Sequence, residues 1–173
     1  MHPAARWPGP AAGPEEQEAL ASPRPSVYAV DVSPSSAAGE VSQYTINPAT
    51  GKLTPKSPKT VATANGPMSI AVSPDGKSAY VNDYNANAIS PYSISPATGK
   101  LTPMSPKTVA APGRPNSIKV APDGNNAYVT SENKGVLSQF AISLTTGKIT
   151  PLSPATVTIP PSGSLGVAVT SAK

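Results

Sequence analysis

The chain has 173 residues, of which 38% are hydrophobic and 13% are charged, and its formal net charge is +4. This length allows one domain with a hydrophobic core, and no apolar run approaches the roughly 20 residues that a membrane helix needs. The absence of cysteine excludes disulfides and thiolate metal sites. The basic residues are spread thinly rather than clustered, so we expect a solvated, mildly basic surface and no nucleic-acid partner.

Residues 1–25 are rich in proline and alanine and are expected to form a flexible tail. They lack the charged and apolar regions of a signal peptide, so the sequence as written predicts a cytoplasmic protein. The only histidine, His2, lies in this tail. Without cysteine or a second histidine there is no Cys–His pair, Ser-His-Asp triad or histidine metal site. We therefore expect neither a metal nor a cofactor.

An internal repeat runs through the rest of the chain. The segments 48–62 and 96–110 are identical apart from Lys56 and Met104, and a more divergent third copy occupies residues 144–158. Several glycine, proline and aromatic positions recur with the same spacing of 48 residues. Self-similarity at a fixed period is typical of repeat architectures. The difference between Lys56 and Met104 falls in the connection to an outer strand, where we expect either side chain to be tolerated.

One repeat, residues 68–115, is expected to form four short strands joined by polar turns. Pro74, Asp75 and Gly76 are the residue types of a tight turn, because proline presets φ, aspartate bonds to the nearby backbone and glycine accepts a positive φ. Gly99 is placed to accept a positive φ in a second hairpin. The predicted strands occupy residues 69–73, 78–82, 88–94 and 107–110.

Four short antiparallel strands in every repeat of this length indicate a β-propeller blade, so the predicted fold class is all-β with about three blades. A β-solenoid is the main rival, but its coils are usually shorter and lack two hairpin turns per repeat. Pro91 has no N–H for strand pairing, which predicts a bulge or a partly free edge in the third strand. The repeats are expected at about residues 26–67, 68–115 and 116–163, followed by the first strand of a next blade at 164–173.

The repeated sequence IAVSPDGKSAYVN, followed by a hairpin ending in TGKLTP, resembles the YVTN-type repeat. In its longer form, with SP after TGKLTP, it resembles the lactonase-like seven-bladed propellers, a family that includes bacterial 6-phosphogluconolactonase. The resemblance covers residues 26–170. It implies a lactonase-family propeller related to enzymes that hydrolyse sugar lactones. Because turn and core residues carry the resemblance, a non-enzymatic propeller module acting as a binding or interaction scaffold is the alternative.

The number of blades bears on both interpretations. Seven blades of this period need about 340 residues, and this chain supplies three, four, four and one strands in successive repeats. Three arrangements are open: an open arc that is a fragment of a larger propeller, a homodimer completing a six-bladed ring, or a three-bladed closure. Unpaired strand edges favour the arc or its assemblies. The missing blades argue against full hydrolase activity in this chain alone.

Polar residues in the loops after the second strands, and in the loop that enters the third blade, are the candidates for a ligand site. Lactone hydrolysis needs an activated water and stabilisation of the developing oxyanion, for which Arg114 with Glu132 or Asp83 are the catalytic candidates. Solvated loop polarity explains the same residues without catalysis and is the favoured interpretation. A sugar lactone or a protein partner is the expected ligand. The further ligand-binding candidates are Tyr84, Asn85, Asn87, Asn116, Asn133 and Lys134.

Overall fold

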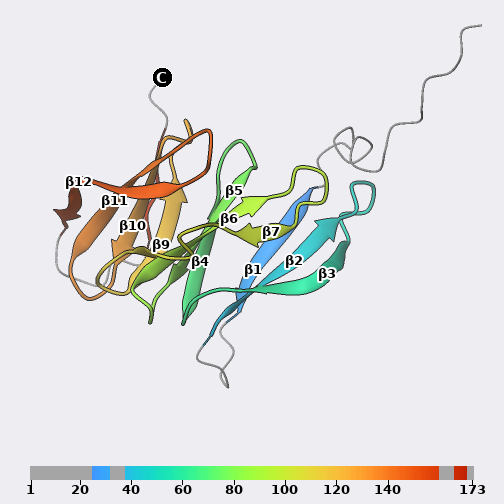
Figure 1. The fold of residues 1–173 in the computed structure, drawn as a ribbon, viewed down its shortest axis with the longest axis horizontal. Helices are drawn as coiled ribbons and strands as arrows, with labels where there is room; N and C mark the ends of the chain where they lie inside the picture. The colour runs from blue at the N-terminus through green and yellow to red at the C-terminus, as the bar shows by residue number, and fades with distance from the viewer. Residues whose placement is uncertain (1–24, 32–37, 160–165, 171–173) are drawn as a thin grey trace, which may run out of the picture.

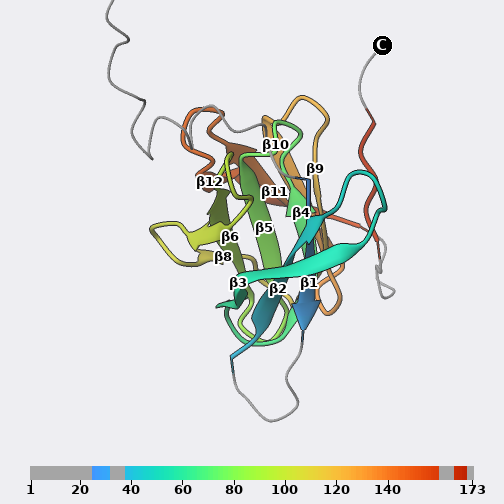
Figure 2. The same ribbon diagram turned by 90° about the vertical axis from the view of Figure 1, so that its right-hand side faces the viewer.

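A computed structural model of the chain describes residues 25–31, 38–159 and 166–170, which contain twelve strands and no helix. The strands form three antiparallel sheets that stand side by side in the order of the sequence (Figure 1). Seen at a right angle, the sheets lie one behind another (Figure 2). The fold is therefore all-β with three propeller blades, as the repeat predicts. No helix that could cross a membrane occurs in the part of the chain that the structure describes.

Blade 1 has three strands, β1 (Ser26–Asp31), β2 (Glu40–Ile46) and β3 (Leu53–Ala62). They are hydrogen-bonded in the order β1-β2-β3. The sequence predicts three strands here because no SPDG turn precedes β1. Among the described residues, no strand pairs with the other edge of β1, so the first blade has the strand count that the repeat predicts.

Blade 2 consists of β4 (Pro67–Val72), β5 (Ser78–Asp83), β6 (Ala88–Ile94), β7 (Leu101–Pro103) and β8 (Val109–Ala110). The first four pair in chain order, and β8 also pairs with β6. The predicted outer strand at residues 107–110 is therefore wrong at its start. The chain begins to pair immediately after the hairpin, and the outer strand is interrupted between β7 and β8.

Blade 3 consists of β9 (Pro115–Val120), β10 (Asn126–Ser131), β11 (Val136–Ile142) and β12 (Ile149–Thr158). These strands pair in the order β12-β11-β10-β9. Residues 166–170 belong to the predicted first strand of a next blade, but they form no strand in this structure. A first strand pairs with the second strand of its own blade, and the described residues include no such strand beyond β12.

The three sheets do not close on one another. Blades 1 and 3 lie on opposite sides of blade 2, so the described residues form an open row (Figure 1). Of the three predicted arrangements, the three-bladed closure is not the one that this structure adopts. The row leaves one face of blade 1 and one face of blade 3 without a neighbouring sheet.

The strands β2, β6 and β11, which pair with the outer strands of their blades, are irregular at one repeated position. In blades 1 and 3 the pairing with the outer strand shifts its register beside Gln43 and Gln139. Pro91 occupies the same position in β6, and its carbonyl accepts a hydrogen bond from the Met104 N–H at 2.9 Å. Met104 lies in the segment between β7 and β8, so this bond joins that segment to β6. The irregularity predicted at Pro91 is therefore a bulge in the pairing with the outer strand.

The predicted turns have the expected backbone. Gly76 and Gly99 have φ of 70° and 65°. Asp75 Oδ1 accepts hydrogen bonds from the Ser73 hydroxyl at 2.6 Å and the Lys77 N–H at 3.0 Å, and these bonds lower the pKa of Asp75. The aspartate therefore closes the turn, and its role is structural.

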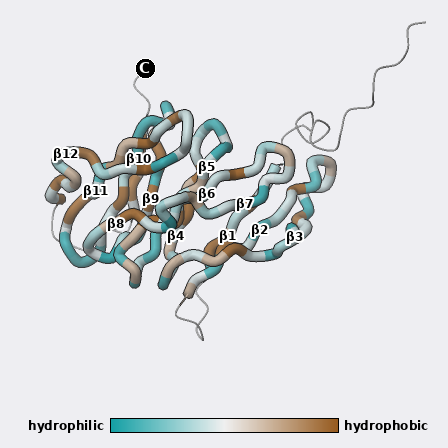
Figure 3. Tube along the Cα trace, viewed as in Figure 1, coloured by the Kyte–Doolittle hydropathy of each residue, from teal (hydrophilic) through white to brown (hydrophobic). Residues whose placement is uncertain are grey.

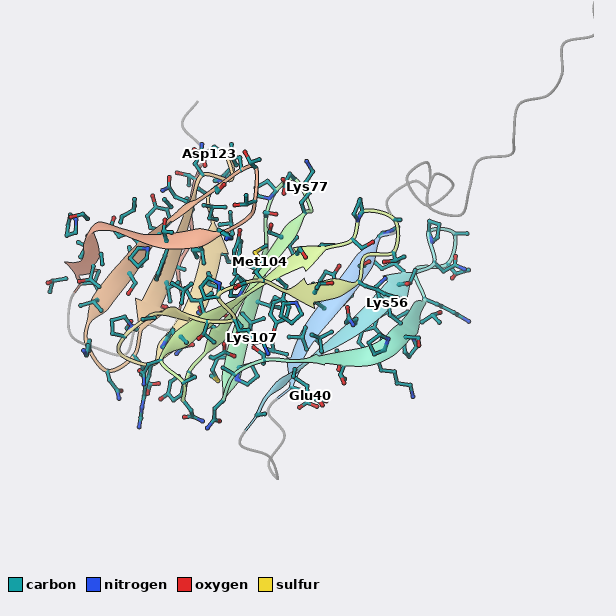
Figure 4. All side chains as sticks on the ribbon, viewed as in Figure 1. Glu40, Lys56, Lys77, Met104, Lys107 and Asp123 are labelled. Atoms are coloured by element: carbon teal, nitrogen blue, oxygen red, sulfur yellow. The ribbon has the colours of Figure 1, made fainter. Side chains whose placement is uncertain are left out.

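The two ends of the blades carry different kinds of connection. The SPDG and TGK turns lie at one end, near Lys77 and Asp123 in Figure 4, and we call this end the turn face. The opposite end lies near Glu40 in the same view. It carries the loops that follow β5 and β10 and the connections from one blade to the next, and we call it the loop face.

The junctions between blades bury the same set of side chains twice, and Figure 3 shows the hydrophobic stretches of the strands. The core between blades 1 and 2 contains Val41, Ala79, Val81, Tyr92, Ile94 and Leu101. The core between blades 2 and 3 contains their counterparts 48 residues later, which are Ile89, Ala127, Val129, Phe140, Ile142 and Ile149. Each blade therefore depends on its neighbour to cover its apolar face.

Hydrogen bonds across the junctions repeat in the same way. The Tyr28 hydroxyl donates to the Gly99 carbonyl at 2.7 Å, and the Tyr80 hydroxyl donates to the Gly147 carbonyl at 2.8 Å. A Cβ atom on either glycine would come within 2.1 Å of a serine Oγ in the preceding blade. The TGK turn of one blade is therefore packed closely against the second strand of the blade before it.

Lys56 also belongs to a junction. It lies in β3, is only 6% exposed, and its ammonium group donates to Thr45 Oγ1 at 2.9 Å and to the Thr98 carbonyl of blade 2 at 2.7 Å. Met104 lies at the next junction, with its Cε beside Gly147. Figure 4 shows Lys56 and Met104 at the two junctions. Both side chains contact a neighbouring blade, so the expectation that this position lies in a tolerant connection does not hold.

Replacing Gly99 by alanine should destabilise the fold more than replacing Gly76 by alanine. Their φ angles are nearly equal, so both variants carry backbone strain of about 1–2 kcal/mol. At Gly99 the new Cβ would overlap Ser26 Oγ, at 2.1 Å. At Gly76 no atom of the described residues lies within 4 Å of the new Cβ. Overpacking of this kind adds about 1–3 kcal/mol. Urea unfolding followed by circular dichroism measures the difference, and equal losses would contradict the close contact between blades 1 and 2.

Candidate functional site

Three side chains from different connections meet on the loop face. Tyr84 follows β5, Arg114 precedes β9 and Glu132 follows β10. The Tyr84 hydroxyl donates to Glu132 Oε2 at 2.5 Å. Arg114 Nη1 donates to the Tyr84 hydroxyl at 3.4 Å, and its guanidinium carbon lies 5.3 Å from the centroid of the Tyr84 ring. We call this group the Tyr84 cluster.

Arg114 and Glu132 are two of the three predicted catalytic candidates, and the structure brings them to the same hydroxyl. Both side chains are exposed and Tyr84 is half-buried. The sequence placed Tyr84 among the binding candidates but did not indicate that it joins the other two. The spacing of 48 residues between Tyr84 and Glu132 was the available signal, because it gives them equivalent places in adjacent blades.

The backbone around the cluster also repeats, and Arg114 departs from the repeat. The Tyr84 N–H donates to the Gly66 carbonyl at 2.7 Å, and the Glu132 N–H donates to the Arg114 carbonyl at 3.1 Å. Gly66 and Arg114 are therefore counterparts, with φ of 71° and 59°. The left-handed conformation costs a non-glycine residue roughly 1–2 kcal/mol. Such outliers are a reason to consider a functional role.

Asn87 holds Arg114 in this conformation. Its Oδ1 accepts a hydrogen bond from the Arg114 N–H at 2.9 Å. Asn87 itself has a φ of 52°, which asparagine tolerates better than most residues. Asn87, predicted as a ligand-binding residue, thus has a role in positioning the backbone of Arg114.

The other loop candidates support the surrounding backbone. Asn85 Nδ2 donates to Asn65 Oδ1 at 3.4 Å, and its side chain lies where a Cβ on Gly66 would be. The Asn133 N–H donates to the Gly113 carbonyl at 3.2 Å. These contacts make Asn85 and Asn133 part of the loop framework.

Lys134 and Asn116 lie outside the contacts of the Tyr84 cluster. The Lys134 stem lies beside Gly113, where a Cβ would come within 2.9 Å of Lys134 Cγ, and the residue is exposed. Asn116 is half-buried in β9, the first strand of blade 3. Both remain predictions as ligand-binding residues.

Asp83 has a different environment from Glu132. It is the last residue of β5 and is wholly buried. Thr63 Oγ1 donates to its Oδ1 at 2.8 Å, and Ser90 Oγ donates to its Oδ2 at 2.6 Å. Burial raises the pKa of Asp83, against the hydrogen bonds from Ser90 and Thr63, which lower it. With both oxygens engaged inside the sheet, Asp83 is a structural carboxyl, and Glu132 is the better placed of the two predicted bases.

Two cavities lie on the turn face, away from the Tyr84 cluster. One of about 430 Å³ lies between blades 2 and 3, where Asp75, Lys77 and Asp123 are among its lining residues. The other, of about 490 Å³, lies between blades 1 and 2 and includes Gly76 and Gly99. Because they occur at equivalent junctions and are lined by repeated turn residues, both follow from the packing of the blades. The sequence analysis did not predict them.

No group of three or more His, Cys, Asp or Glu side chains that could hold a metal ion occurs among the residues described. His2 lies outside those residues. The chemistry available in the Tyr84 cluster is that of one guanidinium, one phenol and one carboxylate. Such a set can bind an anionic or carbonyl oxygen and can accept a proton.

Comparisons with known proteins identify the relatives of this chain. A family model described as "Lactonase, 7-bladed beta-propeller" matches residues 37–162. A search of curated proteins found no match.

Solved structures share the fold at low identity. A candidate 6-phosphogluconolactonase from Bacteroides fragilis has 21% identity and a TM-score of 0.56, over 76% of this chain and 44% of the other. The periplasmic gluconolactonase of Pseudomonas aeruginosa has 24% identity and a TM-score of 0.60, over 82% and 40%. The calcium-binding protein regucalcin from Agrobacterium tumefaciens has 17% identity and a TM-score of 0.52, over 84% and 46%. The chain thus spans less than half of each, and the likeness concerns the fold.

Replacing Asp83 by asparagine should change how stability depends on pH. Because the folded-state pKa of Asp83 is raised, its contribution is fully present below the ordinary aspartate pKa of about 3.9. That contribution is lost as pH rises from the ordinary pKa through the raised pKa. In this interval the unfolded state has released its proton and the folded state has not. The free energy of unfolding of the wild type should therefore fall relative to Asp83→Asn as pH rises across this interval.

Urea unfolding at a series of pH values measures this effect. Asp75→Asn is the control of opposite sign, because the pKa of Asp75 is lowered and its stabilisation is lost as pH falls. If the curves of the wild type and Asp83→Asn ran parallel throughout, the assigned environment of Asp83 would be wrong.

Proposed function

Because this chain belongs to the lactonase family of seven-bladed β-propellers, we propose that its loop face binds a sugar lactone through the Tyr84 cluster. The observation that carries the proposal is Arg114. It keeps a φ of 59° at the position where the preceding junction has Gly66. A glycine would avoid the steric cost, so retention of the long cationic side chain supports a role for that side chain.

Arg114 has the chemistry to recognise a lactone or its phosphate. Its guanidinium offers several N–H donors in a planar arrangement that suits carbonyl, carboxylate and phosphate oxygens. Stacking on the Tyr84 ring at 5.3 Å restricts the orientation of the guanidinium and leaves other N–H groups for a ligand. Hydrogen bonds from a charged donor are stronger than neutral ones. Arg114 is therefore the residue that we expect to contribute most to affinity.

Glu132 is the base for the hydrolysis step of the proposal. A water molecule that gives its proton to the Glu132 carboxylate can attack the lactone carbonyl carbon. Arg114 would stabilise the negative charge that develops on the carbonyl oxygen. The ring C–O bond then breaks, the ring oxygen takes the proton back from Glu132, and the product is a hydroxy acid. Binding of the lactone by this chain is the primary proposal, and hydrolysis depends on that binding.

A non-enzymatic binding module is the second candidate function. The observation that favours it is the exposure of both charged members of the cluster, Arg114 and Glu132. Small-molecule sites are usually concave and bury most of their ligand, whereas exposed Arg and Tyr side chains are frequent in protein interfaces. A cluster of this kind could bind a polar segment of a partner protein with the same groups.

Replacing Arg114 by glycine tests the primary proposal, because Gly66 shows that glycine is compatible with this backbone. We expect Arg114→Gly to fold as well as the wild type and to bind 6-phosphogluconate, the stable hydrolysis product, about tenfold more weakly or worse. Loss of one charged hydrogen bond explains that magnitude. Isothermal titration calorimetry measures it. Lys100→Gln is the matched control, because it removes one cation from an exposed turn on the opposite face.

Replacing Glu132 by glutamine separates hydrolysis from binding. The variant should keep the affinity for 6-phosphogluconate within a few fold and lose hydrolysis of 6-phosphogluconolactone above the spontaneous rate. Substrate depletion in a coupled assay measures that rate. If neither the wild type nor Lys100→Gln bound the product or exceeded the spontaneous rate, the proposal would fail and the scaffold function would replace it.

A further inference from the structure

The outer face of blade 1 exposes a residue that the other blades bury. Leu53, at the start of β3, is 49% exposed. Its counterparts Leu101 and Ile149 are 5% and 4% exposed and belong to the two junction cores. They are covered because another blade precedes theirs. Leu53 therefore lies where a junction core would continue if a blade packed on this side.

The outer face of blade 3 carries the complementary half. Val157, in β12, is 45% exposed, whereas its counterparts Val61 and Val109 pack against the junction cores. Tyr128, in β10, is half-buried, as is its counterpart Tyr28, whereas Tyr80 is wholly buried. The Tyr28 and Tyr80 hydroxyls both bond to the next blade. Val157 and Tyr128 lie where a following blade would cover them.

The two outer faces thus contain the two halves of one further junction. We propose that a second copy of this chain binds here, with blade 3 of one copy packed on blade 1 of the other and the reciprocal junction closing the pair. The interface continues the pattern of the two junctions inside the chain. Blade 3 would contribute Tyr128, Leu137, Leu152 and Val157, and blade 1 of the second copy would contribute Tyr44, Ile46 and Leu53.

The polar contacts of the internal junctions also have their two halves on these faces. The Tyr28 and Tyr80 hydroxyls donate to Gly99 and Gly147, and by the same spacing Tyr128 would donate to the Gly51 carbonyl of the second copy. Among the residues that the structure describes, nothing lies within 4 Å of a Cβ built on Gly51. The space that a preceding blade fills at Gly99 and Gly147 is thus open at Gly51.

Gln139 is placed for a second polar contact. At the first junction, Gln43 Nε2 donates to the Pro58 carbonyl at 3.3 Å, and Gln43 Oε1 accepts from the Leu101 N–H at 2.7 Å. Gln139 Nε2 makes the equivalent bond to the Pro154 carbonyl at 3.0 Å. In the proposed pair, its Oε1 would accept from the Leu53 N–H of the second copy. The internal half of this bridge therefore already exists.

Two copies supply six blades, one fewer than the seven of the lactonase family but within the usual range of four to eight for propellers. The contact is head to tail, and such contacts form a ring when the rotation between units closes. Among the described residues, blade 1 has no first strand, and the sequence of residues 166–170 resembles one. In the pair, residues 166–170 of one copy would lie beside β1 of the other. Both unpaired faces and the unpaired edge of β1 would then be covered.

Replacing Leu53 by glutamate tests the proposal. Size-exclusion chromatography with light scattering should give twice the mass of one chain for the wild type and the mass of one chain, or a weaker pair, for Leu53→Glu. We expect the dissociation constant to rise at least tenfold, because the variant buries a charge in the junction. Leu144→Glu is the matched control. Leu144 is 58% exposed, but its counterparts Pro48 and Pro96 are exposed too, so this variant should pair like the wild type.

A mixture of two variants tests the head-to-tail geometry. Leu53→Glu blocks the blade 1 face and Val157→Glu blocks the blade 3 face. An equal mixture should form a pair through the one junction that remains intact, while neither variant alone should pair tightly. Circular dichroism and urea unfolding confirm that each variant is folded.

Three results would overturn the proposal. They are a well-folded wild-type monomer at high concentration, a pair that Leu53→Glu and Leu144→Glu weaken equally, and a ladder of growing oligomers instead of a closed pair. A folded monomer would show that a second copy of this chain does not cover the two faces. None of these results depends on lactone binding, so the proposed function and the proposed pairing fail separately.

Discussion

The structure depends on the packing of each blade against the next. A single blade is a small twisted sheet that cannot bury its own apolar face, and its neighbour buries that face at every junction. Burial of one Leu, Ile, Val or aromatic side chain contributes about 1.5–3 kcal/mol, and each junction core contains at least six such residues or alanines. The tyrosine-to-glycine hydrogen bonds then set the alignment of adjacent blades. We therefore expect the stability to be approximately the sum of the intrinsic stabilities of the blades and the contributions of the nearest-neighbour junctions, as in solenoid repeat proteins.

The Tyr84 cluster depends on the same packing. Tyr84 belongs to blade 2 and Glu132 to blade 3, while Arg114 lies in the connection between these blades. The three side chains meet because the second junction aligns the loops after β5 and β10. Any change that opens this junction would separate the cluster as well. The site is therefore a property of two packed blades and is absent from either blade alone.

Most of the architecture could be predicted from the sequence, because its signals are local. The SPDG and TGK turns need positive φ at Gly76 and Gly99, and both glycines have it. The contacts between blades could not be predicted in the same way. Lys56 was expected to lie in a connection that tolerates either lysine or methionine, but its ammonium is held inside a junction by Thr45 and Thr98. Contacts of this kind join residues far apart in the sequence, and the repeat alone does not indicate them.

For the candidate site, the sequence predicted the right loops and part of the right grouping. It treated Asp83 and Glu132 as equivalent bases because both are acidic residues near the ends of second strands. They differ by a single residue of register within the repeat, since the counterpart of Glu132 is Tyr84. That one residue decides whether the side chain belongs to the sheet or to the loop, because Asp83 is the last residue of β5 and Glu132 is the first residue after β10. Asp83 therefore meets Thr63 and Ser90 inside the sheet, whereas Glu132 lies in the exposed loop.

The internal repeat also separates structural residues from residues with another role. Positions that keep the same contacts at both junctions, such as Tyr28 and Tyr80, are explained by the packing of the blades. Arg114 replaces a glycine at a strained backbone position, and the packing of the blades requires no arginine there. Leu53 keeps the residue type of a buried position but is exposed. The first departure supports the proposed ligand site and the second supports the proposed pairing, so the two proposals rest on different kinds of exception to one repeat.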